Sequence, residues 1–424
     1  MLLLLLILKF WPVEASPAFH AHFHGMPDLE AHSYEYPMHL HDPQNLAGEA
    51  PQAWQNVLTV GPRNLQWLNL LNAHRKPEDK IDLSNPGASQ GIPMESPLRY
   101  NDPLLNERWN QIEADMPIEL KTVLLGTASL PTELPVDLQT YRTWARKIDV
   151  LYSHSLRWQG MKQNIPYFRT LKVFDFRGLR FLSQSGDAAL KAELDNYKSL
   201  TADRQKQLKG WVWDVCFNAQ KIETPCDTLI EKAVRDNSLF DMFKKYQAAA
   251  RASYETFFVV QVPRKDVRGA QNSLLMPFRP SGIAAIDQFV KVNVEDEWKW
   301  LAGKLNLNFD SSAAANIRFV PGTVAYVDSV GGDTITMDSQ VAIDAWDSKW
   351  TIRHEYGHVL GFPDCYIEFW DDTEQAFVSY QFDLDNLMCS RAGKFNERNK
   401  SELFKAYMAP KLQNSHNHWP SSHQ

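Results

Sequence analysis

The eleven residues from His354 to Asp364, HEYGHVLGFPD, constrain the fold more than any other part of this chain of 424 residues. Two histidines four positions apart lie one turn apart on the same face of a helix, so the imidazoles of His354 and His358 can reach the same metal ion. Glu355 follows the first histidine, where its carboxylate can take a proton from a water on that ion. The pattern therefore predicts a helix that supplies two metal ligands and a general base.

Gly361 predicts where this helix ends. Glycine accepts the left-handed conformation that a helix C-terminus often requires, and Pro363 prevents the helix from continuing. The chain can then turn back and bring Asp364 to the ion as a third, oxygen ligand, which leaves one coordination position open for water. An open position is typical of a catalytic site. The plain alternative is an ordinary helix with two histidines that are solvated or belong to the core.

The pattern HExxHxxGxxD, followed by Asn386-Leu-Met-Cys389, resembles the metzincin clan of zinc metalloproteases. Within that clan it is most similar to the snapalysin-like group of secreted bacterial neutral proteases, in which Asp is the third zinc ligand and a Pro-Asp-x-Tyr sequence follows the glycine. That sequence is Pro363-Asp-Cys-Tyr366 here. The resemblance covers residues 256–410.

The resemblance implies the identity of the site residues and the reaction. His354, His358 and Asp364 match the ligands of one catalytic Zn²⁺, Glu355 matches the general base, and Met388 matches the methionine of the turn beneath the metal. The implied reaction is peptide hydrolysis, in which Glu355 takes a proton from water and passes it to the leaving amine, and the implied partner is a protein or peptide substrate. The chain lacks the tyrosine after the Met turn that steadies the transition state in some relatives. Tyr366 or Tyr380 is a candidate for that role, and each could equally be a packing residue.

The order of the predicted elements is that of an α+β fold. The resemblance implies a metzincin-like catalytic domain over 256–424, with a small, mostly antiparallel-edged sheet and the active-site helix, and helical periodicity predicts a helical domain over 136–255 before it. The residue pattern predicts strands at Thr256–Val262, Phe289–Val294, Asn316–Val320, Val324–Asp328 and Thr334–Met337, and a helix over Glu295–Leu305. In the family, the last strand before the helix, here Thr334–Asp338, borders the cleft and pairs with extended peptide substrate.

The first 135 residues divide into three segments by composition. Residues 1–15, an apolar run followed by Val13-Glu-Ala15, are typical of a secretory signal peptide. Residues 16–50 are rich in histidine and either capture a metal ion or form a flexible, solvated segment. Their histidines are His20, His22, His24, His32, His39 and His41. The Pro and Gly of residues 51–135 predict an irregular wrapping or a pro-region, without long helices over 77–103.

The four cysteines form two local couples, Cys216 with Cys226 and Cys365 with Cys389. In an exported protein this grouping predicts two disulfides, although four cysteines allow three connectivities. Four buried free thiols are the alternative. Because Cys365 adjoins a predicted ligand and Cys389 adjoins Met388, a bond between them would tie the third-ligand loop to the turn beneath the metal.

Charge and hydropathy argue against other kinds of partner. With 44 Lys and Arg against 51 Asp and Glu, the chain has a formal net charge of −7 and no long basic run, which argues against nucleic acid. No uninterrupted apolar stretch of about twenty residues is present, so we expect no stable membrane anchor and a secreted or periplasmic, extracytoplasmic location. The oligomeric state stays open. Two rival functions remain. One is an exported protein without activity that binds zinc and, through its helical domain, a partner; the other is a zinc hydrolase of a non-protein substrate.

Overall fold

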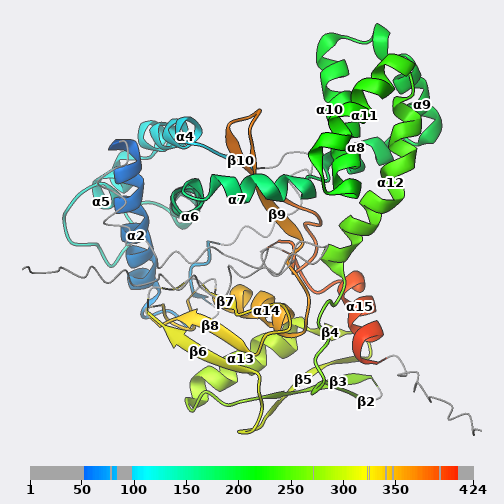
Figure 1. The fold of residues 1–424 in the computed structure, drawn as a ribbon. Helices are drawn as coiled ribbons and strands as arrows, with labels where there is room; N and C mark the ends of the chain where they lie inside the picture. Colours follow the sequence, from blue (N-terminus) through cyan, green and yellow to red (C-terminus); the bar gives the residue numbers. More distant parts are fainter. Residues whose placement is uncertain are drawn as a thin grey trace, which may run out of the picture.

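The computed structural model describes residues 52–76, 79–83, 98–270, 272–321, 323, 325–339, 341–345, 348–390 and 393–408. The predicted signal peptide at 1–15 and the histidine-rich segment at 16–50 lie outside the described residues. Within the described ranges, helices and three small sheets make up an α+β fold (Figure 1). The predicted fold class is confirmed at this level.

The region predicted to be irregular, 51–135, contains three helices within its described residues. They are α2 (Gln52–Asn72), α4 (Asp102–Asp115) and α5 (Ile118–Leu124), and the short strand β1 (Leu98–Tyr100) precedes α4. The irregular reading is wrong at 52–72 and 102–124, because Trp54, Trp67 and Trp109 are fully buried and give these helices apolar faces that pack together. Most of the stretch predicted to lack long helices, 77–103, lies outside the described residues. The Pro and Gly residues that argued against helices are concentrated between α2 and α4.

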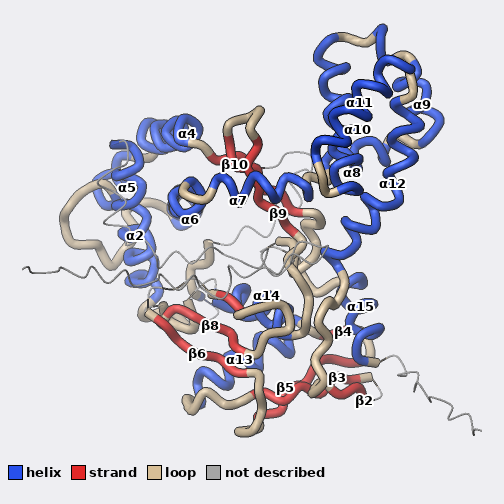
Figure 2. The backbone as a smooth tube through the Cα atoms, viewed as in Figure 1, coloured by secondary structure: helices blue, strands red, loops and turns tan. Residues whose placement is uncertain are grey.

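Residues 136–255 are helical, as predicted. The elements are α6 (Leu138–Lys162), α7 (Ile165–Thr170), the 3-10 turn η5 (Leu171–Phe174), α8 (Arg177–Gln184), α9 (Asp187–Asp195), the 3-10 turn η6 (Tyr197–Ser199), α10 (Ala202–Gln220), α11 (Glu223–Asp236) and α12 (Leu239–Glu255). Helices α8 to α12 pack together as a bundle at one end of the molecule (Figure 2). The predicted disulfide Cys216–Cys226 joins α10 to α11, with the two Cα atoms 5.8 Å apart.

Two small sheets and two helices form the part of the chain that carries the histidine motif. The first sheet has the order β2 (Arg268–Ala270), β3 (Ser273–Phe278), β5 (Gly303–Phe309), β4 (Lys299–Trp300), and the second has the order β6 (Asn316–Val320), β8 (Thr334–Asp338), β7 (Tyr326–Val327). Helix α13 (Ala284–Glu297) connects the parallel strands β3 and β5 and packs beside the motif helix, α14 (Ser348–Val359).

Three predicted elements of this part are wrong. Phe289–Val294, predicted as a strand, lies inside α13. Glu295–Leu305, predicted as a helix, contains the end of α13, strand β4 and the start of β5. Thr256–Val262, predicted as a strand, begins with the 3-10 turn η7 (Thr256–Phe258). A window of six residues fits the strand period and the helix period equally well. In α13, Val290 and Val294 are buried whereas Val292 is 51% exposed, which is the pattern of a helix face.

The strand expected to border the cleft, β8, is the central strand of its sheet. It pairs in parallel with β6, and on its other side Ile335 and Thr336 pair antiparallel with Val327 and Tyr326 of β7. The expectation that Thr334–Asp338 pairs with extended substrate is therefore wrong at Ile335 and Thr336, where β7 already occupies the edge. The outer edge on that side belongs to β7.

A hairpin lies between the third predicted ligand and the Met turn. Strands β9 (Tyr366–Asp371) and β10 (Ala376–Gln381) fill the long segment between Asp364 and Met388, and β1 adds a third strand antiparallel to β10. The hairpin packs through β9 on α7 and η5, which belong to residues 136–255, called the helical part below. Figure 2 shows α7 beside β9. The last described helix, α15 (Glu397–Tyr407), packs on η7. The hydroxyl of its Tyr407 donates to the carbonyl of Leu360, the residue after α14, at 2.8 Å.

Candidate metal centre

Helix α14 presents its two histidines on one face, as the spacing predicts. The ring centroids of His354 and His358 are 4.9 Å apart and the rings are nearly perpendicular, at 86°. The carboxylate of Glu355 completes the group, because potential ligand atoms of the three residues lie within 4.8 Å of one another. These three side chains could hold a metal ion.

Gly361 ends α14 in the left-handed conformation, with φ of +87°. Its N–H donates to the His358 carbonyl at 2.9 Å, and the N–H of Phe362 donates to the Gly357 carbonyl at 3.0 Å, a pair of bonds that defines a Schellman C-terminus. A β-carbon at Gly361 would lie 2.3 Å from the carbonyl oxygen of Val262. Both the backbone angle and the available space require glycine, so the predicted helix end is confirmed.

Beyond Gly361 the chain brings Asp364 back to the two histidines. Its Oδ1 lies 3.0 Å from Nε2 of His354 and 3.4 Å from Nε2 of His358. The carboxylate is fully buried, and among the described residues no hydrogen-bond donor other than these two imidazoles reaches it. The side chain of His354 is 20% exposed and that of His358 is 2% exposed, so the group meets solvent on the His354 side.

The other ring nitrogen of each histidine faces a backbone carbonyl. Nδ1 of His354 lies 3.0 Å from the Leu387 oxygen, and Nδ1 of His358 lies 2.8 Å from the Phe362 oxygen. A carbonyl oxygen only accepts, so each Nδ1 donates. Nε2 therefore carries the lone pair when the ring is neutral and donates to Asp364 when the ring is protonated. Sequence reasoning missed these two carbonyls because a backbone group has no residue-type signal.

The carboxylate and the two imidazoles perturb one another's protonation. Burial lowers the pKa of His354, but the adjacent Asp364 outweighs burial and raises that pKa to about 9. Asp364 also raises the pKa of His358 against the effect of burial. Burial raises the pKa of Asp364, but the imidazoles outweigh it and hold that pKa below its usual range. Metal binding to such a cluster must displace protons from the rings.

The donor set and its spacing fit zinc. With zinc–ligand distances of about 2.0–2.2 Å and tetrahedral angles, two ligand atoms lie about 3.3–3.6 Å apart. The two Nε2–Oδ1 distances here are 3.0 and 3.4 Å. Two imidazoles and a carboxylate are a known ligand set of catalytic zinc sites. The residues therefore fit the ion that the sequence resemblance implies.

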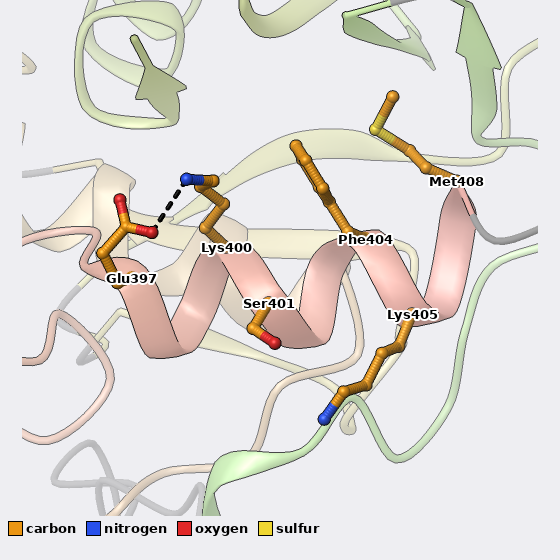
Figure 3. Close-up of a pocket in the computed structure, with 6 residues that line it drawn as sticks. All are labelled: Glu397, Lys400, Ser401, Phe404, Lys405 and Met408. Atoms are coloured by element: carbon orange, nitrogen blue, oxygen red, sulfur yellow. Dashed lines mark hydrogen bonds and ion pairs between the residues drawn. The ribbon is translucent and has the colours of Figure 1, made fainter.

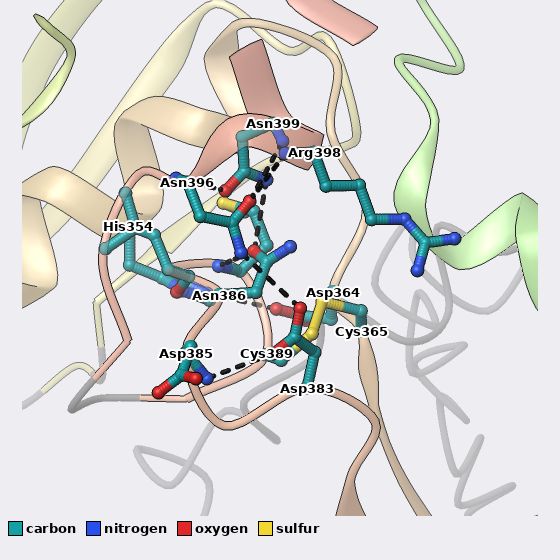
Figure 4. Close-up of a disulfide and its surroundings, with 12 residues drawn as sticks. His354, Asp364, Cys365, Asp383, Asp385, Asn386, Cys389, Asn396, Arg398 and Asn399 are labelled. Carbon is teal, nitrogen blue, oxygen red and sulfur yellow. Dashed lines mark hydrogen bonds and ion pairs between the residues drawn. A yellow bond between two sulfur atoms is a disulfide. The ribbon is translucent and has the colours of Figure 1, made fainter. Parts of the chain in front are cut away.

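The turn that carries Met388 lies against the loop of Asp364 (Figure 4). Met388 is buried, and its carbonyl accepts the N–H of Cys365 at 3.1 Å. The predicted disulfide between Cys365 and Cys389 joins the same two segments, with Cα atoms 4.3 Å apart. Because Cys365 follows Asp364 directly, both links hold the third candidate ligand to the turn.

Asn386 shapes this turn, a role that sequence reasoning did not assign to it. Its side chain is fully buried, and its Oδ1 accepts the N–H of Met388 at 2.9 Å and Nδ2 of Asn399 at 3.1 Å. The carbonyl of the intervening residue, Leu387, is the one that faces His354. The sequence Asn-Leu-Met-Cys was the only available signal for this residue.

The two candidate tyrosines are placed differently. The ring centroid of Tyr366 lies 6.5 Å from that of His354. The hydroxyl of the buried Tyr380 donates to the Phe174 carbonyl at 2.8 Å and accepts the N–H of Phe176. Tyr380 is therefore engaged with the helical part, as the packing alternative expects, and Tyr366 is the tyrosine beside a candidate ligand.

A surface hollow along α15 contains none of these residues (Figure 3). Its lining residues are Glu397, Lys400, Ser401, Phe404, Lys405 and Met408. The hollow is open to solvent and brings together no group of metal-ligating side chains. We assign no chemistry to it.

Comparisons with protein-family models, with curated proteins and with solved structures each yield no match. The similarity to the metzincin clan therefore remains a resemblance in the motif. Any functional conclusion depends on the residues and the geometry described above.

Proposed function

We propose that this protein is a zinc-dependent endopeptidase with a metzincin-type catalytic domain, closest to the snapalysin-like group, that acts outside the cytoplasm. The observation that carries the proposal is the convergence of Nε2 of His354 and Nε2 of His358 on Oδ1 of Asp364, at 3.0 and 3.4 Å. Both Nδ1 atoms are held by carbonyls at the same time. An ordinary pair of core histidines does not require this combination.

The proposed mechanism uses four side chains. His354, His358 and Asp364 would hold one Zn²⁺ and leave one position open. A bound zinc ion lowers the pKa of its water to about 7 and polarises the substrate carbonyl. Glu355 takes the proton from the attacking water and delivers it to the nitrogen of the leaving amine. Glu355 is 4% exposed and follows His354 directly on α14, so the helix fixes its position relative to the ligands.

Two disulfides support a location outside the cytoplasm, where thiols are oxidised. The apolar run at residues 1–15 supports export in the same sense. Among the described residues, no helix has the length and apolar character needed to cross a membrane.

The two alternatives are a zinc-binding protein without activity and a zinc hydrolase of a non-protein substrate. A binding site does not need a carboxylate next to its first ligand, so Glu355 favours catalysis over binding. The substrate class has to be tested directly, because the motif helix is compatible with other hydrolyses.

The variant Glu355→Gln tests the proposal in the full chain. We expect it to keep the zinc content of the wild type and to lower the hydrolysis of labelled casein by about 10²–10⁴-fold, the usual effect of losing a general base. The control Glu397→Gln, which changes an 86% exposed side chain on α15, should keep the wild-type rate. Full activity in Glu355→Gln, or a zinc-loaded wild type that cleaves no protein, would favour the alternatives.

The variant His358→Ala tests the ligand assignment separately. We expect it to bind one zinc ion fewer per chain than the wild type. The difference between the two proteins is the relevant quantity, because the histidines at 20–41 can add zinc to both.

A further inference from the structure

The β9–β10 hairpin connects the candidate metal centre to the helical part of the molecule. Strand β9 begins at Tyr366, two residues after Asp364, and β10 leads back through Phe382 to the Met turn. The N–H of Phe382 donates to the Cys365 carbonyl at 3.0 Å, which closes the base of the hairpin beside the third candidate ligand. The hairpin therefore begins and ends at the metal centre.

Four acidic side chains, from the middle of β9 to the turn at the far end of the hairpin, are paired with cations from another part of the chain. We call Glu368, Asp371, Asp372 and Glu374 the acidic hairpin end, and Arg99, Arg157, Arg169, Lys172 and Arg177 the cationic cluster. The ion pairs are Glu368–Arg157 at 2.7 Å, Asp372–Arg169 at 2.6 Å, Asp371–Lys172 and Asp371–Arg177 at 3.5 Å, Glu374–Arg177 at 3.4 Å, and Glu374–Arg99. Every cation lies between residues 99 and 177, outside the segment that resembles the protease clan.

Several of these ion pairs are withdrawn from solvent. The side chains of Asp371, Glu368 and Arg177 are 6%, 11% and 16% exposed. Water and salt screen ion pairs in such positions less than they screen surface pairs. Removing one partner leaves the other as a partly buried charge without its counter-ion. Removing one partner of a pair that includes Asp371, Glu368 or Arg177 therefore costs more than removing one partner of a surface pair.

Aromatic packing strengthens the same joint. Trp158 of α6 stacks on Trp370 of β9 with ring centroids 6.4 Å apart, and it meets Phe377 of β10 edge-on at 5.4 Å. Phe168 of α7 meets Phe377 at 5.1 Å. The Tyr380 hydroxyl adds its bond to the Phe174 carbonyl. The helical part therefore contacts both strands of the hairpin through aromatic packing, and it also forms ion pairs with the hairpin.

The chain between the Arg157–Glu368 ion pair and the candidate ligand Asp364 is short. Glu368 lies four residues beyond Asp364, and a strand rises about 3.3 Å per residue, so the two are separated by no more than about 13 Å of extended chain. Strand β9 is paired with β10 along its whole length. A displacement of the hairpin at Glu368 would therefore be transmitted to the loop that places Asp364 beneath the histidines.

We propose that the helical part acts as an intramolecular clamp on the β9–β10 hairpin, and that Arg157 is a positioning residue for the third zinc ligand. The guanidinium of Arg177 pairs more closely with Asp175, at 2.6 Å, than with the hairpin. This inference rests on the proposed zinc site. It gives the helical part a function within the molecule: through the cationic cluster it holds the acidic hairpin end, and through the hairpin it keeps Asp364 at hydrogen-bond distance from both Nε2 atoms.

A charge swap of the Arg157–Glu368 pair tests the clamp in the full chain. The readout is the zinc dissociation constant of the one site that His358→Ala abolishes, measured by competition with a chelator. We expect Arg157→Glu and Glu368→Arg each to raise that constant by about tenfold or more, the usual effect of losing a group that orients a ligand. The double variant restores the ion pair with reversed charge and should recover most of the lost affinity.

The matched control is the Arg204–Glu193 pair between α10 and α9. Its N–O distance is also 2.7 Å, and its side chains are 34% and 28% exposed. Neither residue contacts the hairpin in any interaction described here. Arg204→Glu, Glu193→Arg and their double variant should all bind zinc with the wild-type constant. If Glu368→Arg does not fold, as judged by circular dichroism, Arg169→Glu replaces it, because Arg169 and Asp372 are about half exposed.

The outcomes separate the clamp from the proposed enzymatic function. Wild-type zinc affinity in folded Arg157→Glu and Glu368→Arg, or a folded double variant without recovery, would overturn the clamp. A wild type that binds zinc but hydrolyses no peptide would overturn the enzymatic function alone, since the clamp is judged by the dissociation constant. A wild type without zinc at His358 would overturn both.

Discussion

Gly357 and Met388 lie so close together that no side chain fits between them. A β-carbon on Gly357 would lie 2.1 Å from Sδ of Met388 and 3.2 Å from the ring of Trp298. Because Gly357 precedes His358 on α14, this contact brings the Met turn directly against the ligand helix. Glycine inside a helix costs about 1 kcal/mol relative to alanine, and the close approach of Met388 is the compensating reason for it here.

The variant Gly357→Ala should destabilise the protein by about 1–3 kcal/mol, the usual cost of overpacking. It should also weaken zinc binding, because either Met388 or α14 has to move. Urea unfolding and zinc titration measure the two effects. The control is Gly210→Ala in α10, where a β-carbon meets nothing within 4 Å. That variant should keep or slightly raise the stability, and equal losses in the two variants would argue against the contact.

A second glycine pair separates backbone strain from steric conflict. Gly361 and Gly282 have similar φ values of +87° and +84°. A β-carbon at Gly361 would meet the Val262 carbonyl at 2.3 Å, whereas at Gly282 it meets nothing within 4 Å. Gly282→Ala should cost about 1–2 kcal/mol for the left-handed conformation alone, and Gly361→Ala should cost more and also weaken zinc binding. Similar losses of unfolding free energy in Gly361→Ala and Gly282→Ala would show that the contact with the Val262 carbonyl does not require glycine at position 361.

The His354–Asp364 pair predicts how the stability of the zinc-free protein depends on pH. Folding raises the pKa of His354 from 6.5 to about 9. The contribution of the pair is therefore complete below pH 6.5 and is lost as the pH rises through about 9. Zinc has to displace the proton, so zinc affinity should increase over the same interval. Urea unfolding and zinc titration at several pH values measure the two opposite trends.

Asp364→Asn is the control for this pH dependence. It removes the charge that raises the pKa of His354, so the unfolding free energy of the zinc-free variant should lose the decrease between pH 6.5 and 9. The same decrease in Asp364→Asn and in the wild type would show that another group causes it.

The two disulfides predict different consequences of removal. Cys365–Cys389 spans 24 residues and Cys216–Cys226 spans 10, and loop entropy assigns them about 3.4 and 2.7 kcal/mol. Replacing Cys365 and Cys389 by serine should lower both the unfolding free energy and the zinc affinity, because that bond holds the Asp364 loop to the Met turn. Replacing Cys216 and Cys226 should lower the unfolding free energy alone. A similar loss of zinc affinity in both double variants would contradict this distinction.

The features of the site that could be predicted from the sequence depend on residues close together in the chain. The spacing of His354 and His358 is a property of one helix, and Gly361 with Pro363 determines where that helix ends whatever surrounds it. These signals need no knowledge of distant residues, so the return of Asp364 to the histidines could be inferred from the sequence. The two disulfides are similarly local, since each joins cysteines that are near in the chain.

The part that sequence reasoning missed depends on residues far apart in the chain. Arg157 and Glu368 are separated by 211 positions. The sequence around either residue contains no motif that indicates their ion pair. The helices of residues 52–124 were missed because Pro and Gly between them outweighed the apolar faces around Trp54 and Trp109. Apolar and polar residues alternate over Phe289–Val294, as in a strand. The segment is nevertheless helical, because the helix α13 packs against α14 and β5.

The position of zinc in the zinc-loaded full chain tests the central claim most directly. Anomalous X-ray scattering from crystals of that protein locates each bound zinc ion independently of activity. We expect a peak bonded to Nε2 of His354, Nε2 of His358 and a carboxylate oxygen of Asp364, with Glu355 nearby and not bonded to it. Zinc bound only elsewhere in the chain, or a peak at α14 that Asp364 does not reach, would contradict that claim.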